Sequence, residues 1–100
     1  MFYAMIGEDV PNSLEKRAAA RPAHLKRIDA LINSGKLLLA GALPAIDSPD
    51  PGPAGMCGSL IVAEFESVEA AQQWINEDPY VTQGVFAKVT VKPFKKVFPV

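Results

Sequence analysis

The sequence contains little cysteine and no excess of charge of either sign. Cys57 is the only cysteine in 100 residues, so neither an intrachain disulfide nor a cluster of thiolate metal ligands can form. Ten basic and eleven acidic residues give a formal net charge of −1. Nucleic-acid binding needs a clustered basic surface, which this composition does not provide. We therefore expect a reducing, cytoplasmic location and no nucleic-acid partner.

Long hydrophobic runs are also absent. The longest apolar segment, Leu37 to Ile46, has ten residues and contains Pro44, whereas a membrane-spanning helix needs about 20 apolar residues. The apolar start of the chain lacks the positive charge and the small-residue cleavage site of a signal peptide, and its first basic residue is Lys16. The sequence therefore predicts neither a membrane span nor a secretion signal.

The composition that remains is that of a folded domain. Hydrophobic residues make up 49% of the chain and charged residues 21%, which separates it from disordered proteins. A chain of this length forms one domain, residues 1–100, with only marginal stability alone. Association with a second copy would bury further apolar surface and stabilise it.

Periodicity predicts four strands and two helices. Strand patterns cover Phe2–Gly7, Leu37–Leu43, Ser59–Glu66 and Val85–Phe94, and helical patterns extend from residue 13 to about Asn33 and from Val68 to about Glu77. The segment Pro44–Gly55 holds four prolines and two glycines, so we expect a loop without helix or strand. This order predicts an α+β fold of ferredoxin-like, split βαβ type (βαββαβ), with an antiparallel sheet and both helices on one face.

The first helix has further predicted features. Asn12 and Glu15 have the spacing of a capping box, and Gly35 is placed to end the helix. Its expected apolar stripe consists of Leu14, Ala18, Leu25, Ile28 and Ile32, with Leu31 beside it. In the second helix we expect a Ser67 cap and burial of Val68, Ala71, Trp74 and Ile75.

The first and second strands are apolar on both faces. Because the helices cover one face of the sheet only, the other face needs a separate cover. A symmetric homodimer supplies it by stacking two sheets. We therefore expect a homodimer.

Two arginines and the only histidine of the chain lie close together in the first predicted helix. At helical spacing, Arg17, Arg21 and His24 stack on one face, so two guanidinium groups lie beside the only histidine. Pro22 interrupts the same run, where it removes a backbone donor. Such local conflicts are expected where function overrides packing.

Motifs along almost the whole chain resemble those of one known family. They are Ser13–Arg17, Arg21–Leu25, Gly41 with Pro44–Asp47, Gly58–Ser59, Ala63–Ser67, Asp78–Tyr80 and Val91–Lys95. In this order they resemble the YciI-like family, which is defined by the YCII-related domain. The resemblance implies a dimeric α+β barrel. It also implies an enzyme that uses a histidine and an aspartate, which here match His24 and Asp78.

The residues themselves leave two interpretations of each catalytic candidate. His24 borders the apolar stripe and is either a partly buried histidine or a general acid or base, since an imidazole with a pKa of about 6.5 titrates near neutrality. Asp78 precedes Pro79 and either caps a short turn, Pro79 to Thr82, or accepts a hydrogen bond from His24 and fixes its tautomer.

Arg17 and Arg21 are candidate substrate-binding residues. Surface arginines are usually solvated or ion-paired, and Glu15 or Asp29 could pair with either of them. Alternatively, two guanidinium groups one turn apart hold a carboxylate or phosphate. That alternative predicts an anionic small molecule as the ligand.

The remaining substrate-binding candidates are Gly41, Ser59 and Tyr80. Gly41 weakens its strand and marks a bulge or a close approach, while Ser59 follows Gly58 at the start of the third strand and could orient a ligand. Tyr80 is either core packing or part of the pocket wall. We expect Cys57 to be a buried, inert thiol. One histidine and no cysteine pair give no metal-ligand spacing, so we expect no metal.

These observations support one main hypothesis and two alternatives. The main hypothesis is a small enzyme without a cofactor, of lyase, isomerase or hydrolase type, that acts on an anionic metabolite through His24 and Asp78. The first alternative is a non-catalytic binding or regulatory domain that dimerises and senses an anion in the same cleft. The second is an interaction module whose only role is dimerisation.

Overall fold

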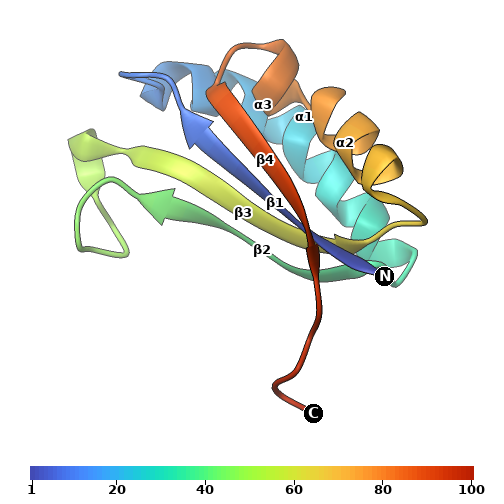
Figure 1. Ribbon diagram of the computed structural model, residues 1–100. Helices are drawn as coiled ribbons and strands as arrows, with labels where there is room; N and C mark the ends of the chain where they lie inside the picture. The colour runs from blue at the N-terminus through green and yellow to red at the C-terminus, as the bar shows by residue number, and fades with distance from the viewer.

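The structure, a computed structural model, describes residues 1–100 and consists of an antiparallel sheet with helices packed on one face (Figure 1). Its elements are β1 (Phe2–Asp9), α1 (Leu14–Asn33), β2 (Leu37–Pro44), the 3₁₀ helix η1 (Gly52–Ala54), β3 (Met56–Glu64), α2 (Val68–Asn76), α3 (Pro79–Thr82) and β4 (Phe86–Phe94). The predicted α+β class and order of strands and helices are confirmed. No helix combines the length and apolar character that crossing a bilayer requires.

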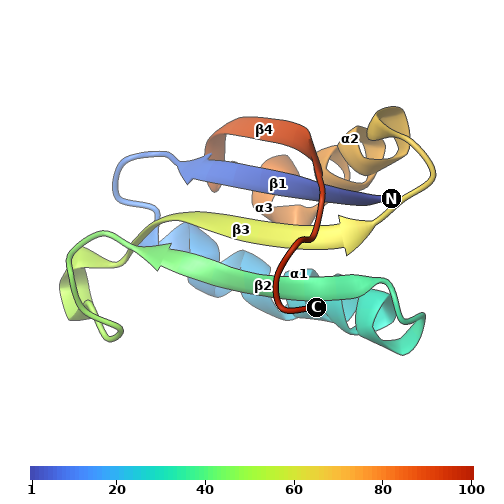
Figure 2. The same ribbon diagram turned by 60° about the horizontal axis from the view of Figure 1, so that its bottom comes forward.

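The sheet has the strand order β2-β3-β1-β4, and every neighbouring pair is antiparallel. The two chain-terminal strands, β1 and β4, therefore pair with each other, as the split βαβ topology requires. Figure 2 shows the sheet in front of the helices, with α1 behind β2 and β3 and with α2 and α3 behind β1 and β4.

Alternation along the strands builds the core. Tyr3 and Met5 of β1 lie opposite Ala63 and Ile61 of β3, and all four side chains are buried on the helix side of the sheet. Helix residues complete this core, chiefly Ala20, Ile28 and Leu31 of α1, Ala71 and Ile75 of α2, and Tyr80 of α3. The core therefore lies between one sheet face and the three helices.

The predicted capping box at the start of α1 is wrong. Asn12 has a positive φ of 57° and lies in the preceding turn, while Ser13 occupies the cap position without a side-chain cap hydrogen bond. The Ser13 hydroxyl instead donates to Asp9 Oδ2 at 2.6 Å. The Ser13 side chain is therefore oriented toward the Asp9 carboxylate, which accepts its hydrogen bond, and not toward the free N–H groups of the first turn of α1.

The predicted apolar stripe of α1 is also mostly wrong. Leu14, Leu25 and Ile32 are 50%, 38% and 54% exposed. The buried residues of α1 are Arg17, Ala20, His24, Ile28 and Leu31. Two polar side chains occupy the buried face because acidic partners on other elements satisfy them, and a pattern of apolar residues cannot show this.

The second helix follows its prediction more closely. Ser67 caps α2 by accepting a hydrogen bond from the Ala70 N–H at 3.0 Å, and Ala71 and Ile75 are buried. Trp74 is only partly covered, and Val68 is exposed. Fewer apolar side chains of α2 are buried against the core than the sequence predicted.

Several strand and loop boundaries differ from their predictions. β1 extends to Asp9, and β3 covers Met56–Glu64 rather than Ser59–Glu66. Pro44 is the last residue of β2, and the loop that follows contains η1, so it is not free of helix. The register of β1 with β4 shifts at Glu8 and Asp9, so β4 begins at Phe86 rather than Val85. Both Val85 and Phe86 are buried, because the bulge breaks the strict alternation there.

The sheet face away from the helices carries several apolar side chains. Strand pairing places Leu39 of β2 opposite Val62 of β3, on the face opposite to Ile61 and Ala40. In the single chain, β2 is an edge strand and is largely exposed.

Candidate functional site

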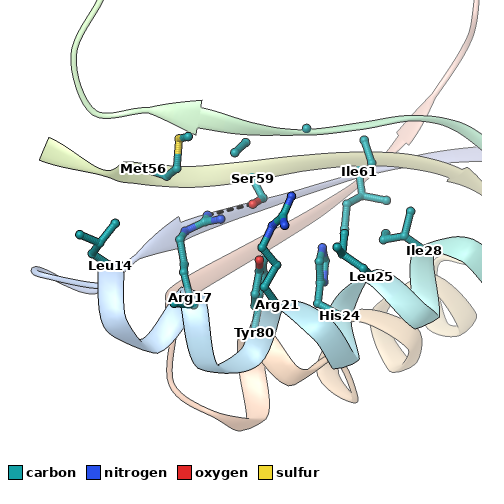
Figure 3. A pocket seen from close by; sticks show the side chains of 14 residues that line it. Leu14, Arg17, Arg21, His24, Leu25, Ile28, Met56, Ser59, Ile61 and Tyr80 are labelled. Atoms are coloured by element: carbon teal, nitrogen blue, oxygen red, sulfur yellow. Dashed lines mark hydrogen bonds between the residues drawn. The ribbon is translucent and has the colours of Figure 1, made fainter. Parts of the chain in front are cut away.

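A pocket of about 490 Å³ opens between α1 and the β2–β3 half of the sheet, with α3 at its back (Figure 3). Fourteen residues line it, and nine of them are hydrophobic. Five predicted site residues from three elements, Arg17, Arg21, His24, Ser59 and Tyr80, meet in this pocket, and the sixth, Gly41, lies in its wall. The seventh, Asp78, lies directly behind it.

Asp78 joins the pocket to the turn that follows α2. Its side chain is fully buried, and Oδ2 lies 2.8 Å from His24 Nδ1. The same oxygen accepts the Tyr80 N–H at 3.0 Å and so caps α3. The two alternative roles of Asp78, turn cap and histidine partner, are therefore both present in one carboxylate.

A third donor to this carboxylate, Arg27, was missed by the sequence analysis. Arg27 Nη1 donates to Asp78 Oδ1 at 3.0 Å, and Nη2 donates to the Trp74 carbonyl at 2.8 Å. Its guanidinium lies over the Trp74 ring, 4.2 Å from the ring centre. Arg27 follows His24 by three residues and shares its helix face, and this spacing was the available signal.

The hydrogen bonds of Asp78 define the tautomer of His24. Because Oδ2 already accepts from a backbone N–H, it acts as an acceptor toward His24 as well, and Nδ1 carries the proton. Nε2 has no hydrogen-bond partner in the protein. Every fully buried side-chain nitrogen or oxygen in the structure does have one, so Nε2 is not fully buried. Because His24 lines the pocket, Nε2 is accessible from the pocket.

Tyr80 forms the wall behind His24. The two rings stack in parallel, with centres 3.9 Å apart and planes inclined by 10°. Tyr80 is 4% exposed and lines the pocket, with the Arg17 guanidinium 5.0 Å from the centre of its ring. Burial raises the pKa of Tyr80 above its usual 10.0, and the nearby Arg17 and Arg21 charges offset this only in part.

Arg17 is held by the protein itself. Its Nε and Nη2 bind the two carboxylate oxygens of Asp9, and Nη2 also donates to the Gly58 carbonyl at 2.7 Å and to Ser59 Oγ at 2.9 Å. The partner is Asp9 rather than Glu15 or Asp29, the two acids considered from the sequence. Asp9 lies outside the helix, so helical spacing could not identify it.

Arg21 has the opposite environment. No hydrogen bond or ion pair holds its guanidinium, and the residue is exposed. Figure 3 shows its side chain rising from α1 toward the strands, between Arg17 and His24. The two arginines therefore differ in kind: the charge of Arg17 is neutralised by Asp9, whereas that of Arg21 is available to a ligand.

The small residues of the pocket have distinct environments. A Cβ added to Gly41 would meet no atom within 4 Å, and the residue paired with Gly41 on β3 is Leu60. A Cβ on Gly58 would instead collide with the Gly7 carbonyl oxygen. Cys57 is exposed, so the prediction of a buried thiol is wrong. Cys57 lies at the register shift of β2 against β3 between Leu43 and Pro44, where the regular pairing is interrupted. No three His, Cys, Asp or Glu side chains lie close enough to hold a metal.

Comparison with known proteins identifies relatives over almost the whole chain. The model of the YCII-related domain family matches residues 1–95. Protein YciI of Escherichia coli O6:H1 is 57% identical over 98 residues, which cover 98% of this chain and 100% of that protein. Fusaric acid biosynthesis protein 2 of Gibberella fujikuroi is 27% identical over 95 residues, which cover 93% of this chain and 91% of that protein.

One solved structure is similar in both fold and sequence. It is 5-chloro-2-hydroxyhydroquinone dehydrochlorinase (TftG) from Burkholderia phenoliruptrix AC1100, in complex with 2,5-dihydroxybenzoquinone. The two chains align with a TM-score of 0.83 and 26% identity, over 95% of this chain and 94% of the other.

Proposed function

The chain belongs to the YCII-related domain family, and we propose that it is a small acid–base enzyme that acts on an anionic small molecule. In this proposal His24 transfers the proton through Nε2, Asp78 orients the imidazole, and Arg21 binds the negative charge of the substrate. Gly41, Ser59 and Tyr80 shape the substrate pocket, and Arg17 supports it from behind through Ser59.

The observation that carries this proposal is the contact between His24 and Asp78. A fully buried carboxylate lies 2.8 Å from Nδ1 of an imidazole whose other nitrogen reaches a pocket. A histidine with a purely structural role would have both nitrogens satisfied by the protein. Leaving Nε2 without a partner keeps a lone pair available to a proton of a bound molecule.

The reaction class we favour is elimination or isomerisation. Both need a base that removes a proton and a cation that stabilises the resulting anion, and His24 and Arg21 supply these two groups. The related structure is named as a dehydrochlorinase, which supports elimination. The proposed proton transfer uses side chains of this chain only, so we propose an enzyme that works without a cofactor.

We further propose that the single domain, residues 1–100, acts as a homodimer of the dimeric α+β barrel type. The support is the sheet face away from the helices, where Leu39, Leu43 and Phe94 are exposed apolar side chains. Stacking this face on that of a second copy buries both surfaces at once.

A ligand screen followed by proton exchange tests the proposed function. Anionic metabolites are first screened by thermal shift, where a ligand at a hundred times its dissociation constant adds about 2.7 kcal/mol to the free energy of unfolding. Ligands that bind are then incubated with the protein in D₂O, and deuterium incorporation is followed by NMR. We expect incorporation with the wild type and none with His24→Gln, although that variant still binds.

Two outcomes contradict this function. If His24→Gln exchanges the ligand proton as fast as the wild type, the histidine is not the base. If ligands bind through Arg21 and no proton exchange or product is ever detected, the domain is a sensor of anions rather than an enzyme.

A further inference from the structure

The charge inventory of the pocket limits what it can bind. The Arg17 charge is neutralised by Asp9 in a contact that uses both carboxylate oxygens. The charge of Asp78 is matched by Arg27 at 3.0 Å. Among the arginine and aspartate side chains at the pocket, Arg21 is the one that remains without an opposite charge. A single cation matches a ligand that carries one negative charge.

The walls of the pocket are largely apolar. Nine of its fourteen lining residues are hydrophobic, and small ones occur on both sides, with Ala18 on α1 and Ala40, Gly41 and Ala42 on β2. The pocket lies between a helix and the sheet (Figure 3). Such a lining favours a ligand with an apolar body.

Two donors lie side by side at this space, the Tyr80 hydroxyl and the Arg21 guanidinium (Figure 3). No hydrogen bond or ion pair with the protein holds Arg21, and Tyr80 belongs to a side chain that is 4% exposed. An oxygen of a bound molecule can accept from both. Because the tyrosine remains protonated, it acts there as a donor toward an anionic oxygen.

From these three features we infer that the site selects small oxygen monoanions with an apolar body, and discriminates against phosphate esters. Arg21 and the Tyr80 hydroxyl bind the charged oxygen, and the apolar walls bind the body. This inference rests on the proposed function, because it uses the same pocket, and it names the substrate class. A phosphate dianion would bring a second negative charge and further oxygens into a pocket with one free cation, at a desolvation cost.

Four compounds with one common ring test this inference by calorimetric titration in mildly alkaline buffer. Para-nitrophenolate and para-nitrobenzoate are monoanions, para-nitrophenyl phosphate is a dianion, and nitrobenzene is neutral. We expect at least one monoanion to bind about tenfold or more tightly than the phosphate ester and the neutral ring. The two monoanions separate a phenolate or enolate ligand from a carboxylate ligand.

Three variants assign the binding groups. Arg21→Gln is expected to weaken monoanion binding about tenfold or more, the usual effect of losing one charge-assisted hydrogen bond, and Tyr80→Phe about threefold to tenfold. Lys26→Gln removes the same charge from an exposed position on α1 outside the pocket and is expected to leave affinity unchanged.

The inference is overturned if the phosphate ester binds as tightly as the tighter-binding of the two monoanions, or if neither monoanion binds at millimolar concentration. Equal effects of Arg21→Gln and Lys26→Gln would also overturn it, because binding would then follow net charge alone. If the phosphate ester binds tightly and this binding is lost in Arg21→Gln, the anion site of the proposed function is supported. The restriction to monoanions is then excluded. The two proposals can therefore fail separately.

Discussion

His24 Nδ1 and Asp78 Oδ2 lie 2.8 Å apart, and the same carboxylate also holds Arg27 and the backbone of Tyr80. One buried side chain thus links α1 with the start of α3, and Arg27 extends the link to α2 through the Trp74 carbonyl. The pair that orients the proposed base is therefore also a cross-link between the helices. Because the orientation of His24 depends on this packing, site and core stability are coupled.

We predict that Asp78→Asn destabilises the protein by about 3 kcal/mol. The amide has nearly the same shape, but it leaves Arg27 without an anionic partner and offers His24 a neutral oxygen or an N–H group in place of a carboxylate oxygen. Urea denaturation measures the change. Asp29→Asn, on the exposed face of α1, is the control and should stay within about 0.5 kcal/mol of the wild type. A similar small effect of Asp78→Asn would show that the cluster does not stabilise the fold.

We predict opposite effects for the two arginines of the pocket. Arg17→Met leaves the buried Asp9 carboxylate without its partner, so the free energy of unfolding should fall by about 3 kcal/mol or more. Arg21→Met removes an exposed, unpaired side chain and should change stability by less than about 0.5 kcal/mol. Denaturation curves recorded side by side test this contrast, and comparable losses in both variants would refute it.

The fold was predictable from periodicity because each strand and helix has its own local pattern. The alternation in β3 and the Ser67 cap of α2 are examples that the structure confirms. The boundary of β4 was not predictable, since a bulge against Asp9 depends on the partner strand. Pairing across strands is a tertiary property that a single segment does not encode.

The site was predictable in its residue types but not in its partners. The clustering of Arg17, Arg21 and His24 followed from helical spacing alone. Which arginine is neutralised depends on Asp9, which the bend before α1 brings back onto the helix. The buried face of α1 was misassigned for the same reason, because a paired arginine or histidine can replace an apolar residue there.

We predict that Tyr80 makes the protein less stable at high pH. Its pKa in the folded state is raised above the unfolded value of about 10, so the folded protein holds this proton more tightly than the unfolded chain does. The stabilising contribution is complete below pH 10 and is lost as the pH rises through the folded-state value. In Tyr80→Phe, the free energy of unfolding should fall less steeply above pH 10 than in the wild type. Parallel pH profiles of the two proteins would contradict this prediction.

We predict that two glycines near the pocket respond oppositely to alanine. Gly58→Ala places a Cβ against the Gly7 carbonyl oxygen of the paired strand and should destabilise the protein by about 1 to 3 kcal/mol. Gly41→Ala meets open space and should be neutral or slightly stabilising, since alanine has less conformational entropy to lose. Thermal unfolding of both variants gives the comparison, and a loss of stability in Gly41→Ala would mean that this position is covered, for example by a second subunit.

We predict that Leu39→Glu shifts the proposed homodimer toward monomer. Leu39 is 48% exposed on the sheet face away from the helices, so the substitution should cost the isolated chain little. In a dimer that stacks two such faces, symmetry would bury two like charges in one interface without partners. Sedimentation velocity at matched concentrations measures the shift.

Val68→Glu is the matched control for this last prediction, because Val68 is exposed on α2, on the other side of the sheet. It should leave the sedimentation coefficient unchanged. A wild type that sediments as a monomer at all concentrations would exclude the dimer, and then the apolar face would need another cover. Equal dissociation by both variants would instead show that added negative charge, rather than the position of Leu39, weakens association.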